Sequence, residues 1–297
     1  EIYSRPDRQN DYADDLNTRS QMINYLSGGS VYNPTDKGLG VPFEMTLAFH
    51  SDAGFSETDE WIGTLGVYTT NFNEGKLNSG ISRHASRDLT DMVMTELQHD
   101  LSAKYGRQWN RRGMWNRNYS ETRLPAVPSM ILEILSHQNF ADMRMGHEPD
   151  FKFTVARSVY KAILKHTATM HGTDYVVQPL PVTRFAIEEG SKHTFRLSWQ
   201  GVVDMQEPSA NPRGYIVYTR LGHGGWDNGT YVKNNYYTFH AEPGLVYSFK
   251  VTAVNKGGES FPSEILSAYH AKKNEGTVLI VNGFGRTSGP ATYESAE

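Results

Sequence analysis

The pattern of apolar residues changes at Gly172, and this change constrains the fold more than any other feature of the chain. Before Gly172, segments with apolar residues at helical spacing alternate with short apolar runs bounded by polar or turn residues. From Tyr175 to about Ala271 there are only short strand-like segments, separated by turn signals such as Asn228-Gly229 and Gly257-Gly258. The sequence therefore predicts two domains of different structural class.

The first region reads as alternating helices and strands. Helices are expected over residues 11–27, about 86–105 and about 153–170, and strands over residues 45–52, 64–70 and 128–136. Strands that alternate with helices indicate an α/β fold, with a mainly parallel sheet and flanking helices.

The second region is predicted to be an all-β sandwich, with strands over residues 194–199, 214–220, 236–240, 247–255 and 265–269. Trp199 is placed to fill its centre, and Tyr247 has the position of a tyrosine corner. The region resembles a fibronectin type III domain, and Val251–Ser260 is typical of that family's sixth strand and following turn. The resemblance implies a protein or carbohydrate partner. We expect domains at 1–172 and 173–272, with 273–297 starting a further domain or a tail.

Composition excludes several classes of protein. The 297-residue chain has no cysteine, which excludes disulfides and thiolate metal sites. Its net charge of −4, with acids and bases intermixed, gives no support for nucleic-acid binding. No window approaches the roughly 18 apolar residues of a membrane span, and the first residues lack a signal-peptide pattern. Because residues 1–6 read as the tail of a strand and residues 276–285 as a buried strand with a glycine turn, we expect a piece of a longer polypeptide.

Two residues that can do chemistry come at the ends of buried runs. His50 follows Met45–Phe49, and Glu133 follows Pro128–Leu132. In open α/β sheets, ligands bind in the crevice outside the carboxyl ends of the strands. The sequence therefore places an imidazole and a carboxylate where a site is expected.

Four features in order resemble the catalytic domain of zinc-dependent N-acetylmuramoyl-L-alanine amidases of the type-3 family. They are a strand end with Arg5, the Leu16-Asn17-x-Arg19 helix, His50 at a strand tip, and Arg112-Gly113 followed by Pro125–Glu133. The resemblance implies a peptidoglycan or muropeptide substrate, cleaved between N-acetylmuramic acid and L-alanine, and a periplasmic, cell-surface or secreted location. It further implies that His50 is the third ligand of Zn²⁺ and Glu133 the catalytic carboxylate. The family's other two zinc ligands lie upstream of this chain.

Each of these residues also has a structural interpretation. His50 can be a core histidine bonded to the backbone, and Glu133 can pair with Arg112 or Arg123. Five further histidines have simple structural interpretations. His84 and His99 are expected on the solvated face of the long helix or beside it, His137 and His147 in loops after the Glu133 strand, and His223 in a hairpin loop.

A segment rich in hydrogen-bond donors and aromatic residues, Arg111–Tyr119, is predicted to be a loop that contacts substrate through Arg112, Asn118 and Tyr119.

Two functions other than amidase activity stay open. One is a catalytically inactive glycan- or peptide-binding or adhesion protein of the cell envelope. The other is a polysaccharide lyase or hydrolase.

Overall fold

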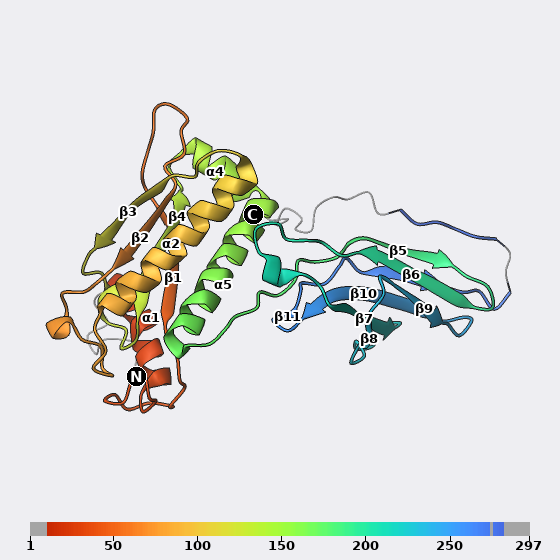
Figure 1. The fold of residues 1–297 in the computed structure, drawn as a ribbon, viewed down its shortest axis with the longest axis horizontal. Coiled ribbons are helices and arrows are strands. Elements are labelled where there is room, and N and C mark those ends of the chain that lie inside the picture. Colours follow the sequence, from red (N-terminus) through yellow and green to blue (C-terminus); the bar gives the residue numbers. More distant parts are fainter. Residues whose placement is uncertain (1–10, 274–275, 282–297) are drawn as a thin grey trace, which may run out of the picture. The chain divides into compact units, whose positions relative to one another are not determined.

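The chain divides into two units, Glu1–Val177 and Gln178–Glu297 (Figure 1). The computed structural model describes residues 11–273 and 276–281. The first unit has the α/β character predicted from its sequence, and the second is the predicted β-sandwich.

The first unit contains five α-helices and four strands among its described residues. In chain order these are α1 (Asp11–Ser27), β1 (Thr46–Asp52), β2 (Thr64–Tyr68), α2 (His84–Tyr105), β3 (Arg111–Asn116), α3 (Ser120–Arg123), β4 (Ser129–Ser136), α4 (Phe140–His147) and α5 (Pro149–His171). A short 3₁₀ turn, Asn73–Gly75, lies between β2 and α2.

The strands form one sheet in the order β1-β4-β2-β3. The outer pairs, β1 with β4 and β2 with β3, are parallel, whereas β4 and β2 run antiparallel. Two of the three pairs are thus parallel, and β1 and β3 are the edge strands of this sheet.

One face of this sheet is covered by α2 and α5, which lie side by side across it (Figure 1). Met130 and Leu132 of β4 are buried in the core that these helices form, together with Leu97 of α2 and Val159 of α5. The helical spacing of apolar residues in α2 and α5 is the reason that they pack here. Because neighbouring residues of a strand point to opposite faces, Ile131 and Glu133 face the other side.

The second face carries a small apolar cluster of Ala48, Leu65, Val67 and Ile131. The short helix α3 lies close to β4 and β2, and α1 packs against α3. This face therefore has less helical cover than the first, and it is the face to which Glu133 points.

The second unit is built from two antiparallel sheets. One contains β8 (Thr230–Val232), β7 (Gly214–Leu221), β10 (Val246–Asn255) and β11 (Gly258–Glu259) in that order, with β12 (Leu266–Tyr269) also paired to β10. The other contains β5 (Thr183–Glu189), β6 (Thr194–Gln200) and β9 (Tyr236–His240).

Two details predicted for the sandwich are confirmed. Trp199 is buried in its core. The hydroxyl of Tyr247 accepts a hydrogen bond of 3.2 Å from the backbone N–H of Glu242, five residues upstream, as in a tyrosine corner. His223 lies in the turn that follows β7, as expected for a hairpin residue.

Three sequence predictions are wrong. The segment containing Arg112 is an edge strand and not a loop, since Arg111–Asn116 pairs with β2. His147 ends helix α4. The strand predicted from residue 276 is absent over 276–281, where the aliphatic side chains of Val278 to Val281 are exposed. An apolar run forms a strand only where another backbone is available to pair with it. The rest of that predicted strand lies outside the described residues.

Candidate active site

His50 and Glu133 are neighbours on adjacent parallel strands. Their Cα atoms are register partners in the β1–β4 ladder, and Glu133 is also paired with Leu65 of β2. Registered residues of neighbouring strands point to the same face, so both side chains lie on the less covered face of the sheet. Both residues stand inside their strands, before the carboxyl ends at which the sequence placed them.

Glu133 is a half-buried carboxylate that lacks an ion-pair partner among the described residues. Its Oε2 atom is fully buried and makes no hydrogen bond in the described part of the chain. Burial raises the pKa of Glu133 above its ordinary value, and Asp52 and Glu121 raise it further, whereas His50 and Arg112 oppose the shift. The structural alternative, in which Arg112 or Arg123 neutralises Glu133, is therefore not what the structure contains.

His50 is held by a carboxylate from another element. Its Nε2 atom lies 2.8 Å from Oε2 of Glu121 in α3. The other oxygen of Glu121 accepts a hydrogen bond of 3.3 Å from Arg19 of α1, and Arg19 also donates to Asp15 at 2.7 Å. His50 is therefore positioned by side-chain contacts and is not a core histidine bonded to backbone groups.

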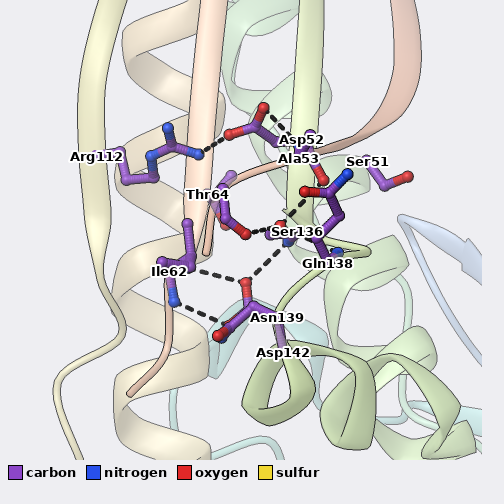
Figure 2. Close-up of polar contacts among 12 residues, drawn as sticks. Ser51, Asp52, Ala53, Ile62, Thr64, Arg112, Ser136, Gln138, Asn139 and Asp142 are labelled. Carbon is purple, nitrogen blue, oxygen red and sulfur yellow. Dashed lines mark hydrogen bonds and ion pairs between the residues drawn. The ribbon is translucent and has the colours of Figure 1, made fainter. Parts of the chain in front are cut away.

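Arg112 forms an ion pair with Asp52 (Figure 2), and the charges of both residues act on the carboxyl group of Glu133. Burial alone would raise the pKa of Asp52, but the hydrogen bonds from Arg112 and from the backbone of Ala53 lower it. Asp52 and Glu133 are thus two carboxylates whose pKa values move in opposite directions. Such a separation is common where one carboxyl group carries protons and the other stays charged.

The remaining predicted contact residues, Asn118 and Tyr119, lie between β3 and α3. Asn118 is hydrogen-bonded to Arg123 at 3.5 Å, and Tyr119 is half exposed. Within the described residues, no hydrogen bond or ion pair joins either of them to His50 or Glu133. Their predicted contact with substrate stays a prediction.

A buried aspartate fixes the loop between β1 and β2. The carboxylate of Asp142 in α4 accepts hydrogen bonds from the backbone of Ile62 (2.9 Å), Gly63 (3.2 Å) and Ser136 (2.8 Å), and from the side chain of Asn139 (3.2 Å), as Figure 2 shows. These contacts tie the loop to the end of β4. The end of the loop, just before β2, is therefore held at a fixed point beside the carboxyl end of β4.

A largely apolar cavity of about 610 Å³ lies beside β1, where helix α5 covers the sheet. Its walls include Phe49, His50, Ile134 and Val155, whereas Glu133 is not among its lining residues. The cavity is therefore lined in part by His50 but not by the Glu133 carboxylate.

The described residues do not form a complete zinc site. Among residues 11–273 and 276–281, no three or more His, Cys, Asp or Glu side chains are arranged to hold a metal ion. His50 offers one imidazole, whereas a catalytic zinc takes three protein ligands. His137 and His147 do not complete such a set, and the role of His50 as a metal ligand stays a prediction.

Sequence reasoning missed Glu121 and underrated Asp52. Glu121 lies in a four-residue helix, too short for any periodic signal, and it is separated from His50 by 71 positions along the chain. Asp52 follows His50 by two residues and reads as part of an acidic loop.

Comparisons with known proteins support the second unit most directly. The model of the fibronectin type III domain matches residues 180–269. Curated proteins give no match. None of the described helices is long and apolar enough to cross a membrane.

Three solved structures illustrate the similarities. The twitchin kinase region from C. elegans is 24% identical, with a TM-score of 0.29, over 32% of this chain and 17% of that chain. Titin domains A168–A170 are 22% identical, with a TM-score of 0.29, over 32% of this chain and 33% of that one. An N-acetylmuramoyl-L-alanine amidase from Clostridium difficile 630 is 12% identical, with a TM-score of 0.37, over 52% of this chain and 66% of that one.

The chain spans less than two thirds of each of these three structures. The two-sheet topology, the buried Trp199, the tyrosine corner and the matching family model agree with one another. Residues 180–269 form a fibronectin type III domain.

Proposed function

We propose that the first unit hydrolyses the amide bond between N-acetylmuramic acid and L-alanine in peptidoglycan, with Glu133 as general base and then general acid. The observation that carries the proposal is the buried, unbonded Oε2 of Glu133 beside His50 on the neighbouring strand. The order of sequence features typical of type-3 amidases supports this choice of substrate.

The position of Glu133 suits proton transfer. No described residue donates a hydrogen bond to Oε2, so no protein donor competes with water for the Glu133 carboxylate as the water attacks the amide carbon. The raised pKa of Glu133 brings the carboxyl group closer to neutrality, which favours return of that proton to the departing amine. Arg112 is held by Asp52, so it is kept close to the site without neutralising Glu133.

The zinc requirement and the location in the cell envelope belong to the proposal as expectations from the family resemblance. A zinc ion would polarise the amide carbonyl and acidify its bound water. Since the described residues do not complete a ligand set, no step is assigned to zinc here. The fibronectin type III domain is proposed to bind a protein or carbohydrate partner.

The test is release of stem peptides from purified muropeptides by the whole chain, measured as new amino-terminal L-alanine. Glu133→Gln is expected to lower turnover by about 100-fold or more, the usual contribution of a general base. Glu57→Gln, which changes an exposed carboxylate of the loop after β1, is the matched control and should leave turnover unchanged.

Two results would overturn the proposal. One is normal turnover by Glu133→Gln. The other is tight binding of muropeptides by the parent chain with no release of stem peptide, which would favour the inactive binding protein. Zinc dependence is measured separately, on the longer polypeptide expected to supply the family's other two ligands, by metal analysis and by adding a chelator; we expect bound zinc there and loss of turnover with the chelator.

A further inference from the structure

Glu121 divides its two carboxylate oxygens between two partners. Oε2 lies 2.8 Å from Nε2 of His50, and Oε1 lies 3.3 Å from Nη1 of Arg19. The side chain of Glu121 is only 12% exposed, so water competes little for these contacts. The carboxylate thus connects α1 and α3 to the imidazole on β1.

The contact defines how His50 carries its proton. An ionised carboxylate only accepts hydrogen bonds, so Nε2 of His50 must be the donor. In a neutral imidazole the proton is then on Nε2, and Nδ1 holds the lone pair. A carboxylate that receives a ring N–H also fixes the orientation of the ring, as is common for histidines in active sites.

We propose that Glu121 is a positioning residue of the candidate active site, which holds His50 in the Nε2–H tautomer and leaves Nδ1 as its functional nitrogen. The functional part of this inference rests on the proposed function, whereas the tautomer follows from the contact alone. In this tautomer, only Nδ1 of His50 has a lone pair that can accept a hydrogen bond.

Arg19 completes the arrangement from the other side of the carboxylate. Its hydrogen bond to Glu121 keeps the second oxygen occupied, and Asp15 in turn holds Arg19 at 2.7 Å. Glu121 is therefore restrained from both ends, which limits the positions that the His50 ring can take.

The tautomer is tested by long-range ¹H–¹⁵N NMR of the whole chain with labelled histidine, in slightly alkaline buffer where ordinary imidazoles are neutral. We expect His50 to have a protonated Nε2 and an unprotonated Nδ1. Glu121→Ala should abolish this preference, and Glu121→Gln should retain it because an amide oxygen also accepts the hydrogen bond.

Asp88→Ala is the matched control, because it removes an exposed carboxylate of α2 that pairs with Arg87 and belongs to none of the contacts around Glu121 and His50. It should leave the His50 signals unchanged, and amide spectra check that each variant is folded. A parent chain with the Nδ1–H tautomer, or a Glu121→Ala variant with unchanged His50 signals, would refute the proposal. Either result can be obtained whether or not the chain is an amidase.

The functional consequence is measured as stem-peptide release. Loss of a carboxylate that orients a site histidine typically costs about 10- to 100-fold. We therefore expect Glu121→Ala to lower kcat by that factor with KM little changed, and Glu121→Gln to recover most of it. If Glu121→Gln lowers kcat as much as Glu121→Ala does, then Glu121 does not act by orienting His50. A parent chain without turnover would contradict the proposed function and leave the NMR result to decide the tautomer.

Discussion

At the scale of single residues, the environment of Glu133 favours function over stability. Burial raises the pKa of Glu133 in the folded chain above its ordinary value. A carboxyl group with a raised pKa stabilises the fold most below the unfolded pKa, about 4.3 for glutamate, and this contribution is lost as the pH rises through the folded pKa. At neutral pH the ionised Glu133 is therefore a cost to the folded state.

Glu133→Gln should accordingly stabilise the first unit at neutral pH while it removes turnover. The gain should shrink below about pH 4, where the parent carboxyl group is itself largely neutral. Urea titrations followed by the amide signals of β4 measure the difference between variant and parent at each pH. Asp52 has a lowered pKa, so it stabilises the fold above its unfolded pKa and loses this contribution as the pH falls. Because Asp52 is present in both proteins, the difference in stability between variant and parent isolates the contribution of Glu133.

Arg112 gives a second prediction at this scale. The positive charge of Arg112 lowers the pKa of Glu133. Arg112 also pairs with Asp52, and this pairing partly offsets the negative charge of Asp52, which raises the pKa of Glu133. Arg112→Ala should therefore move the acid limb of the pH–rate profile to higher pH. Arg111→Ala is the control, since Arg111 pairs with Asp91 of α2, and it should leave the acid limb where it is in the parent. A downward shift in Arg112→Ala would contradict the arrangement.

At the scale of elements, a buried ion cluster joins α2 to α5. Lys161 of α5 is 3% exposed and lies 2.8 Å from Asp100 and 2.8 Å from Glu96, both on α2. Ser158 adds a hydrogen bond of 2.6 Å to Asp100. The two helices that cover the sheet are thus joined by charge as well as by their apolar faces.

Lys161→Ala should destabilise the first unit by about 3–5 kcal/mol, because the buried carboxylate of Asp100 loses its lysine partner, whereas Glu96 keeps Lys165 at 3.0 Å. Lys104→Ala removes an exposed lysine that pairs with Asp150 at 2.7 Å, and should cost no more than about 1 kcal/mol. Urea unfolding of both variants provides the comparison. Equal losses in the two would show that burial of the Lys161 cluster contributes nothing.

The helices and strands differ in how well their sequences predict them. Helix α2 ends at Tyr105 before Gly106 in the left-handed conformation, as its glycine indicates. Edge strand β3 was missed because its residues, Arg111–Asn116, show no clear apolar alternation, and its pairing with β2 decides its structure. Helix α4 is short, and it is fixed by the contacts of buried Asp142, which local sequence does not reveal.

At the scale of the whole molecule, the change of pattern at Gly172 predicted two classes of fold in one chain, and both are present. Each sheet's apolar residues lie at positions that periodicity can identify. The candidate site is different, because Glu121, Arg19 and Arg112 reach it from elements distant in sequence. Sequence reasoning placed His50 and Glu133 together through parallel strands, but contacts between side chains of α1, α3 and β3 depend on packing.

The second unit has a hydrophobic core of its own, and this leads to the last prediction. Residues 178–281 should fold alone, since Trp199, Phe249 and Val251 are buried within this unit and its two sheets close over them. Tyr247→Phe should cost about 1 kcal/mol, because it removes the hydrogen bond that the hydroxyl accepts from the backbone of Glu242 and leaves that backbone N–H without this partner.

Tyr269→Phe is the matched control for Tyr247→Phe. Tyr269 is on the neighbouring strand β12 and its side chain is half exposed, so loss of its hydroxyl should have little effect. Urea unfolding of residues 178–281 and of the two variants gives the three free energies. If the separate unit fails to unfold cooperatively, then its core does not suffice for folding. If both variants lose the same free energy, then the tyrosine corner makes no special contribution to the sandwich.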